Sequence, residues 1–446
     1  MSFPRYPEYK DSGVEWLGEV PEHWEVCALK RMFQVMGGST PKSEHEAFWD
    51  GDVVWITPAD LGQLSGFSIY GSSRQITQDG LASCGTTLVP CGSIVLSTRA
   101  PIGYIGIADV SLCTNQGCKA LVPSSGAISR FYAYLFSVVS EELNIRGRGA
   151  TFLELSADAL GAFVLCAPSV SEQSAIAAFL DRETGKIDAL VAEQEKLIAL
   201  LTEKRRAVIS HAVTKGLNPA APMKDSGIEW LGEVPAHWTV VSLKHLVSNP
   251  IIDGPHETPM KCDEGIPFVS AESVSQGFIN FEKMWGYISP DDHEQYSKRY
   301  SPKRGDILLV KLGATTGTTA LVETDDDFNI WVPLAAIRLS IGIIPKFILH
   351  VLRSNSLMVA YELNWTYGTQ QTLGLRTISN LRIPLPPDEE QREIVNHLDS
   401  VIPSLETLIA EALHAIDLLK EHRSALISAA VTGKIDVRGL VEREAA

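Results

Sequence analysis

The chain has 446 residues, 45% of them hydrophobic, and a formal net charge of -16. Its length exceeds that of one ordinary hydrophobic core and predicts roughly two to four domains, and its composition excludes a disordered or fibrous protein. The acidic balance argues against a basic surface spread over the whole chain, which is the usual footprint of nucleic-acid binding.

No targeting or membrane segment is predicted. The N-terminal stretch MSFPRYPEYKDSG lacks the apolar core of a secretory signal. The most apolar window, residues 330–352, is interrupted by Pro333, Arg338, Gly342, Pro345 and Lys346. The seven cysteines form no zinc-binding spacing and are expected to be reduced, structural thiols. We therefore expect a cytoplasmic protein.

Two nearly identical stretches lead into the two halves of the chain. KDSGVEWLGEVPEHWEV occupies residues 10–26, and KDSGIEWLGEVPAHWTV occupies residues 224–240. A second matched pair follows in each half: PSVSEQSAIAAFLD at residues 168–181 and PPDEEQREIVNHLD at residues 386–399. The repeated order predicts four parts, with the bounds 1–167, 168–216, 217–386 and 387–446.

The regions between the matched blocks predict mixed α+β structure. Strands are expected at residues 52–57, 93–97 and 306–311, and short helices near residues 131–143 and 346–363. The two regions share little sequence beyond a Gly, Ser and Thr-rich apolar character, so two different domains on one repeated frame are expected.

The blocks that begin at residues 168 and 386 predict long helices. Apolar residues recur there with a seven-residue period, which is typical of a coiled-coil seam. Gly185 and Pro403 occupy matching positions and disfavour a helix interior, so a short helix, a break and a long helix are expected in each block. The seam is predicted at Ile187, Leu190, Leu197, Leu201, Val208, Leu405, Leu408, Leu419 and Leu426.

Two helices of matched length can pack about a pseudo-twofold axis and act as a ruler that separates two domains. The piece at residues 186–214 would span roughly 44 Å at 1.5 Å per residue, and one turn of B-DNA measures roughly 34 Å. An ordinary helical hairpin is the simpler interpretation, and the two are compatible.

Two further segments complete a resemblance. They are SIVLSTRAPIGYIGIA at residues 93–108 and GDILLVKLGATTGTTALV at residues 305–322. Together with the paired lead-ins and Pro-Glu-Gln blocks, they resemble the specificity subunit of type I restriction-modification systems over essentially the whole chain. The resemblance implies an α+β fold with a pseudo-twofold internal repeat. In it, two target recognition domains are separated by two long conserved helices packed as an antiparallel coiled coil.

The resemblance also implies a function and partners. Each domain would read one half of a bipartite, asymmetric double-stranded DNA target, and the chain would provide addressing without catalysis. The helices would dock two copies of the methyltransferase (modification) subunit, and a restriction/translocase subunit would join them. S-adenosylmethionine, ATP and Mg are expected in those partners, and no cofactor is expected in this chain.

No catalytic or metal site is predicted from the residues. The GATTGTT stretch at residues 313–319 lacks the lysine and spacing of a phosphate-binding loop and is expected to be a turn between strands. The acidic clusters at residues 291–292 and 325–327 lack the ordered carboxylates and lysine of a nuclease. Two alternatives stay open: a coiled-coil scaffold that reads no sequence, and a self-contained tandem-domain nuclease.

Candidate DNA-binding residues are the Lys, Arg, Asn and Gln side chains of the two variable regions, because these types usually read base edges. Two glycine-rich stretches, RGRGATF at residues 146–152 and YGTQQTLGLR at residues 367–376, stand at matching places before the Pro-Glu-Gln blocks. The candidates are Lys42, Arg74, Arg99, Asn115, Lys119, Arg146, Arg148, Lys261, Lys298, Arg299, Lys303, Arg304, Lys311, Gln370, Gln371 and Arg376.

The variable regions are not basic overall. Residues 31–165 contain 8 basic and 11 acidic residues, and residues 245–386 contain 12 and 15. A positive field must therefore be concentrated on one face or supplied by partner subunits. We expect weak, salt-sensitive DNA binding by the isolated chain and tight binding with the modification subunits.

Overall fold

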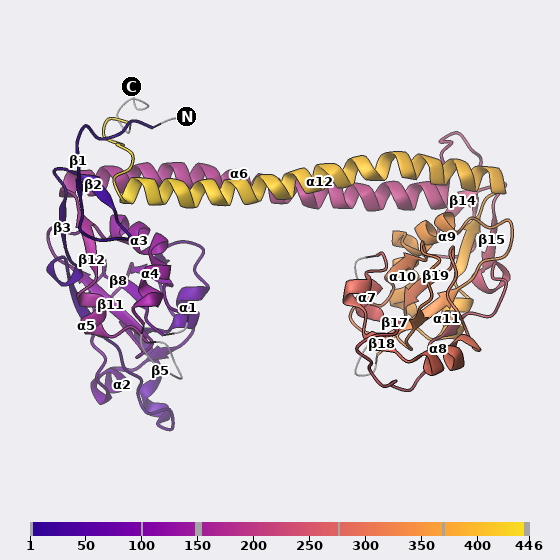
Figure 1. Ribbon diagram of the computed structural model, residues 1–446, viewed down its shortest axis with the longest axis horizontal. Helices are drawn as coiled ribbons and strands as arrows, with labels where there is room; N and C mark the ends of the chain where they lie inside the picture. The colour runs from indigo at the N-terminus through magenta and orange to yellow at the C-terminus, as the bar shows by residue number, and fades with distance from the viewer. Residues whose placement is uncertain (1–2, 100, 148–153, 275–276, 368–370, 441–446) are drawn as a thin grey trace. The chain divides into compact units, whose positions relative to one another are not determined.

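The computed structural model describes residues 3–99, 101–147, 154–274, 277–367 and 371–440. The chain divides into two compact units: Met1–Gln194 with His414–Ala446, and Glu195–Leu413. Each unit contains one α+β head and half of each of two long helices (Figure 1). In the described part of the chain, every helix is too short or too polar to cross a membrane.

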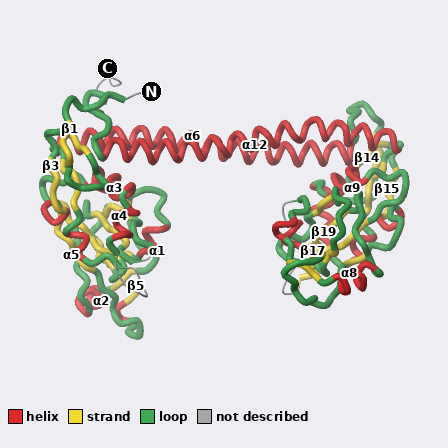
Figure 2. Tube along the Cα trace, in the orientation of Figure 1, coloured by secondary structure: helices red, strands yellow, loops and turns green. Residues whose placement is uncertain are grey.

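The two long helices are α6 (Val170–Lys215) and α12 (Asp388–Val431), and Figure 2 shows both as uninterrupted helical tubes. The expected break at Gly185 and Pro403 is therefore wrong. Glycine and proline cost a helix interior about 1 and 3 kcal/mol, and burial of the apolar residues on either side of them outweighs this. Both residues are exposed, so neither disturbs the buried face.

The helices run antiparallel, and an ion pair at equivalent positions joins them in each unit. In the first unit Arg423 Nε lies 3.0 Å from Asp188 Oδ1, and in the second Arg205 Nη1 lies 3.1 Å from Glu406 Oε1. Adding 218 to 188 and 205 gives 406 and 423, so the second pair repeats the first with the helices exchanged. The internal repeat predicted from the sequence is therefore present in the contacts themselves.

The predicted seam is half correct. Its buried members are Ile187, Leu201, Leu405 and Leu426, whereas Val208 and Leu419 are half-buried. The prediction is wrong for Leu190, Leu197 and Leu408, whose exposed fractions are 51%, 42% and 44%. The residues one position later, Val191, Ile198 and Ile409, are half-buried and face inward in their place.

The first head is built on two sheets. A five-stranded sheet has the order β4-β11-β8-β9-β6, and a three-stranded sheet has the order β10-β5-β7 with β10 parallel to β5. Its strands are β4 (Phe33–Gly37), β5 (Trp49–Ile56), β6 (Ser68–Ile69), β7 (Gln75–Ile76), β8 (Ile94–Ser97), β9 (Ile105–Ala108), β10 (Leu112–Thr114) and β11 (Cys118–Pro123). Its helices are α1 (Pro58–Gly62), α2 (Gln78–Ser83), α3 (Ser129–Val138), α4 (Ser140–Ile145) and α5 (Ala157–Gly161).

The second head has the same strand order except that, in the described residues, its main sheet has no counterpart of β6. Its main sheet has the order β16-β22-β19-β20, and its small sheet has the order β18-β17-β21 with β17 parallel to β21. Its strands are β16 (Ile252–Asp253), β17 (Ile266–Val269), β18 (Gly286–Ile288), β19 (Ile307–Val310), β20 (Thr319–Leu321), β21 (Asn329–Ile330), β22 (Leu334–Ile337), β23 (Thr366–Tyr367) and β24 (Gln371–Thr372). Its helices are α7 (Ala271–Val274), α8 (Pro290–Ser297), α9 (Pro345–Leu352), α10 (Asn355–Asn364) and α11 (Leu375–Ser379). Two dissimilar sequences therefore form one fold.

Each head begins and ends in a pair of strands next to the long helices. The lead-ins form the hairpins β1 (Tyr9–Asp11) with β2 (Glu19–Pro21) and β13 (Met223–Asp225) with β14 (Glu233–Pro235). The entry and exit strands are β3 (Glu25–Ala28) with β12 (Val164–Ala167), and β15 (Thr239–Ser242) with β25 (Arg382–Leu385). Both pairs are antiparallel, so each head leaves the frame and returns to it at neighbouring points.

The core of each head is continuous with the long helices. In the first head, residues 131–136 of α3 are all buried and share a cluster with Ile176, Phe179 and Leu180 of α6. In the second head, residues 347–349 and 351–352 of α9 share a cluster with Ile394 and Leu398 of α12. These apolar contacts of α3 with α6 and of α9 with α12 therefore fix each head on its long helix.

Candidate nucleic-acid interface

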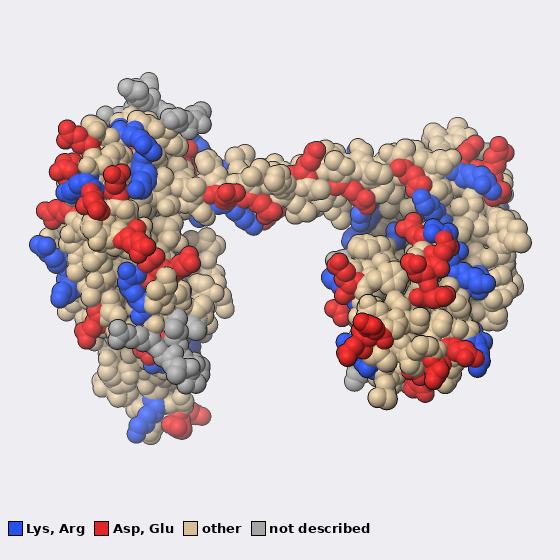
Figure 3. Space-filling model, viewed as in Figure 1, with Lys and Arg blue, Asp and Glu red and all other residues tan. Residues whose placement is uncertain are grey.

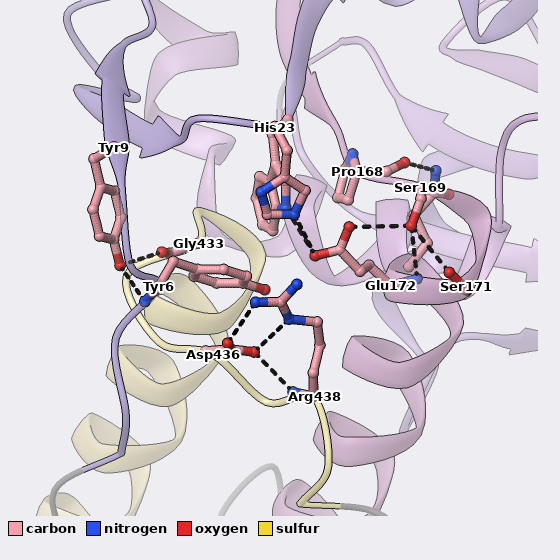
Figure 4. A network of polar contacts seen from close by, with 12 residues as sticks. Tyr6, Tyr9, His23, Pro168, Ser169, Ser171, Glu172, Gly433, Asp436 and Arg438 are labelled. Carbon is pink, nitrogen blue, oxygen red and sulfur yellow. Dashed lines mark hydrogen bonds and ion pairs between the residues drawn. The ribbon is translucent and has the colours of Figure 1, made fainter.

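The first His-Trp pair fixes its lead-in to α6. His23 Nε2 lies 2.9 Å from Glu172 Oε1, and Trp24 Nε1 donates to the same oxygen at 3.2 Å (Figure 4). Burial by itself would raise the pKa of Glu172, but hydrogen bonds from His23, Trp24 and Ser169 hold that pKa below its usual value. The carboxylate is therefore a charged anchor at the start of the helix.

The second His-Trp pair makes the same anchor on α12. His237 Nε2 lies 2.7 Å from Glu390 Oε2, and Trp238 Nε1 donates to that oxygen at 3.0 Å. The next residue in each block, Gln173 or Gln391, accepts a hydrogen bond from a backbone amide of its head. The repeated His-Trp and Glu-Gln pairs of the sequence thus contact each other in both halves. We call this contact between a lead-in and the start of a long helix the clamp.

The end of α12 closes the first lead-in. The Tyr9 hydroxyl donates to the carbonyl of Gly433 at 3.1 Å, and the Arg438 guanidinium lies 4.7 Å from the centre of the Tyr6 ring (Figure 4). The end of α6 does the same for the second lead-in, where Lys215 Nζ donates to the carbonyl of Glu233. Each head is thereby clamped between the start of one long helix and the end of the other.

Polar side chains gather at one edge of the first head, where β8 ends and β11 begins. Thr40, Arg99, Gln116, Lys119 and Glu154 form this first polar edge. Arg99 Nε donates to Glu154 Oε2 at 3.0 Å, and Lys119 Nζ lies 3.9 Å from Glu154 Oε1. The Thr40 hydroxyl donates to the Gln116 side chain. Loops far apart in sequence therefore bring two cations, a carboxylate and two neutral polar groups together.

Backbone contacts hold the first polar edge in place. The amide of Thr98 donates to the carbonyl of Gly117 at 2.8 Å, and the amide of Leu155 donates to that of Thr98 at 2.9 Å. A Cβ atom at Gly38 would overlap the carbonyl oxygen of Asn115, so only glycine fits there. The edge is therefore set by strand ends and a tight backbone approach.

The second head carries a different polar edge, formed by Asp253, His256, Arg299, Lys311 and Gln371. Asp253 is 4% exposed and lies 2.8 Å from Arg299 Nη2, 3.1 Å from His256 Nε2 and 3.3 Å from Lys311 Nζ. A cavity of about 500 Å³ opens beside it, lined in part by Asp253, His256 and Arg299. One buried carboxylate thus orients three cationic or titratable side chains around a hollow.

The two polar edges lie at equivalent backbone positions in the two heads. The amide of Lys311 donates to Pro333 at 2.8 Å and the amide of Leu373 to Lys311 at 2.8 Å, which repeats the bonds of Thr98 in the first head. The antiparallel bridge between Arg99 and Glu154 in the first head is matched by a bridge between Leu312 and Thr372 in the second. Equivalent positions therefore carry different chemistry.

Five of the sequence candidates lie at these edges, with Asn115 adjoining them. The five are Arg99, Lys119, Arg299, Lys311 and Gln371, and the Asn115 side chain accepts from the amide of Gly117. Lys311 is only 8% exposed and is paired with Asp253. Arg148 and Gln370 lie outside the described residues.

The other candidates lie elsewhere on the heads. Arg74 stacks on the Trp49 ring at 3.6 Å, and Arg146 pairs with Glu142 at 2.8 Å. Lys298 and Arg304 pair with Glu294 and Asp325, and Lys261 lies 5.9 Å from the centre of the Trp285 ring. The side chains of the remaining three are exposed, namely Lys42, Lys303 and Arg376.

Five members of the edges are not among the residues predicted from the sequence: Thr40, Gln116, Glu154, Asp253 and His256. Four of them are not of the Lys, Arg, Asn and Gln types that usually read base edges, and Gln116 is of such a type but is absent from the prediction. The sequence does hold one signal for the position of the edges, a glycine at Gly38 and at Gly254. At each of these two positions a neighbouring strand approaches so closely that a Cβ atom would overlap its backbone.

The charge on the surface is mixed. On the face drawn in Figure 3, Lys and Arg side chains alternate with Asp and Glu side chains over each head. Within the described ranges, no group of three or more His, Cys, Asp and Glu side chains is arranged to hold a metal ion. The cationic groups at the two edges are therefore local features on an acidic chain.

Comparison with known proteins agrees with this architecture. A relative from Methanocaldococcus jannaschii, the type I restriction enzyme MjaIX specificity subunit, is 28% identical over 97% of this chain and 98% of its own length. The EcoBI specificity subunit of Escherichia coli is 24% identical over 76% of this chain and 72% of its own length.

Two solved structures share the fold. One, from work on complex assembly and conformational transition of the type I R-M system, has a TM-score of 0.70 at 16% identity and covers 92% of this chain and 98% of its own. The HsdS subunit from Thermoanaerobacter tengcongensis has a TM-score of 0.52 at 16% identity, covering 93% of this chain and 98% of its own. The family model described as the type I restriction modification DNA specificity domain matches residues 21–198 and 237–415. The chain therefore belongs to the family of type I restriction-modification DNA specificity proteins, and it carries that domain twice.

Proposed function

We propose that this chain is the DNA sequence-specificity subunit of a type I restriction-modification complex and that it reads a bipartite, asymmetric target. The observation that carries the proposal is the contrast between the two heads. Their clamps are the same and their strand order is the same apart from β6, yet the polar edges differ at equivalent positions, with Arg99 and Glu154 in one and Leu312 and Thr372 in the other. A constant frame with unlike edges is what reading two unlike half-sites requires.

The polar edges are the proposed contact surfaces for DNA. They combine Arg, Lys and Gln side chains with nearby glycine loops, and such side chains donate to base edges and phosphates. Because the heads as a whole are not basic, we expect these edges to supply selectivity, while most of the affinity comes from partner subunits.

The proposed partners are methyltransferase (modification) subunits, two per complex, and a restriction/translocase subunit. Exposed leucines on the long helices support docking, because they lie outside the seam and leave apolar surface uncovered. These are Leu190, Leu197, Leu200, Leu408, Leu413 and Leu418, with exposed fractions between 42% and 54%. In this proposal S-adenosylmethionine, ATP and Mg serve the partners, and this chain provides addressing in the cytoplasm.

The test is to express the chain with a modification subunit in a host and to map methylated bases by single-molecule sequencing. We expect a split, asymmetric motif that appears only when both proteins are present. Replacing residues 31–165 by the first head of another family member should change one half of the motif and leave the other unchanged. A stable complex without a motif would favour the scaffold alternative, and methylation or cleavage by the chain alone would favour an enzyme.

A further inference from the structure

In the first polar edge, the Nε atom of Arg99 is held by a hydrogen bond, and its two terminal Nη groups are open to a ligand. Arg99 Nε donates to Glu154 Oε2 at 3.0 Å, and the antiparallel bridge between the two residues fixes their backbones side by side. The Arg99 side chain is 42% exposed. Among the described residues, the structure gives the terminal Nη groups no hydrogen-bond partner. The open end is therefore a pair of parallel donors with a fixed direction.

The chemistry of this fork selects its ligand. Two parallel N–H donors match two acceptors in one plane, as on the O6 and N7 edge of guanine or on a phosphate. Lys119 Nζ lies 3.9 Å from Glu154, so the edge carries two cations and one carboxylate. Glu154 therefore weakens the attraction of the edge for a phosphate, while the fixed pair of donors on Arg99 still matches the paired acceptors of a base edge. A base edge is therefore favoured over the DNA backbone.

We propose that Arg99 recognises a guanine in the half-site read by the first head and that Glu154 is its positioning residue. This inference rests on the proposed function, because it assumes that the first head reads DNA. At the same backbone positions the second head has Leu312 and Thr372, which have no such fork. The second head therefore does not read a guanine from this position.

The experiment is methylation mapping of the full complex with variants of the first polar edge. In Arg99→Ala, one guanine position of the first half-site should accept other bases, with discrimination reduced roughly 5- to 150-fold. The second half-site should be unchanged. Arg99→Lys should relax the same position, because lysine keeps the charge but lacks the fork.

Variants of Glu154 test its positioning role. Glu154→Ala should relax the same guanine position, and Glu154→Gln, which keeps an acceptor for Arg99 Nε, should recover much of the discrimination. A residue with a merely structural role would instead lower methylation at all sites without relaxing one base. The double variant R99L/E154T, which installs the side chains of the second head, should behave like Arg99→Ala.

The matched control is Arg130→Ala, because Arg130 is also half-exposed and paired with a carboxylate, that of Asp181, at 2.7 Å, and it is not among the DNA-binding candidates. It should leave the motif unchanged. An Arg99→Ala complex that assembles and keeps its full motif, with uniformly weaker binding and a smaller salt dependence, would make Arg99 a phosphate contact and overturn this inference alone. A wild-type complex without any split motif would overturn the proposed function as well.

Discussion

We predict that His350 on α9 makes the second head sensitive to acid. The side chain is 7% exposed, and its Nδ1 atom has no hydrogen-bond partner among the described residues. Burial and the neighbouring charge of Arg353 lower its pKa to about 4, with Lys346 adding to the effect and Asp399 opposing it. The folded protein therefore holds a neutral histidine where an unfolded chain would hold one with an ordinary pKa.

The sign and size of the effect follow from proton linkage. The folded-state pKa is below the unfolded value of 6.5, so the unfolded chain binds more protons between pH 6.5 and 4. Stability from this group is fully present above pH 6.5 and is lost as the pH falls. The loss is about 2 kcal/mol by pH 5 and about 3 kcal/mol by pH 4.

Hydrogen exchange of the strand amides in the two main sheets measures this loss within one molecule. Between pH 7.5 and 5, after correction for intrinsic exchange, β19 and β22 should lose protection while β8 and β11 serve as the internal reference. At the matching position the first head has Tyr134, whose hydroxyl donates to Asp181 at 2.7 Å. His350→Tyr should therefore remove the acid sensitivity of the second head. An identical pH profile in the wild type and this variant would refute the assignment.

The remaining predictions concern the helices and their clamps. Leu201→Asp should destabilise the second unit by about 3 kcal/mol or more, because it buries an unpaired charge. Leu197 is exposed, so Leu197→Asp should leave the thermal unfolding midpoint nearly unchanged and should instead weaken binding to a modification subunit. Equal midpoints for these two variants would contradict the corrected seam. Seven residues inserted after both Leu197 and Ala415 should add about 10 Å of helix and lengthen the spacer by about three base pairs, as read by methylation mapping; an unchanged spacer would rule out the ruler. Glu172→Gln should speed hydrogen exchange in the first unit only and Glu390→Gln in the second only, because each carboxylate serves one clamp.

The frame of the protein could be predicted from its own repeat. The matched blocks locate both lead-ins and both long helices, and the strand expected at residues 306–311 is observed as β19 (Ile307–Val310). These elements follow from local sequence, since apolar periodicity and turn residues act over short distances. The shared topology of the two heads could not be predicted in this way, because different side chains fill equivalent sheets.

The seam shows where periodicity alone fails. In a heptad repeat, the spacing between successive seam residues alternates between three and four residues. The leucine-rich stretch LIALL at residues 197–201 has apolar residues that fit either order of these two spacings. Burial selects Ile198 and Leu201, whereas Leu197 and Leu200 face outward. Only the partner helix decides between the two orders.

The polar edges show a second limit. Arg99 pairs with Glu154, 55 residues away, and Lys311 with Asp253, 58 residues away. Sequence reasoning identified the cations by their type, but the carboxylates that orient them come from the topology of the sheet. Which of the candidates touch bases stays a prediction.

The entry and exit strands of each head have a consequence for how new specificities arise. Glu25 pairs with Ala167 and Thr239 with Leu385, so the two ends of each head are hydrogen-bonded neighbours roughly 5 Å apart. Any domain whose own ends lie that close can be exchanged there as a cassette, with the clamps and helices untouched. The protein is thus built so that recombination can change what is read without changing what is assembled.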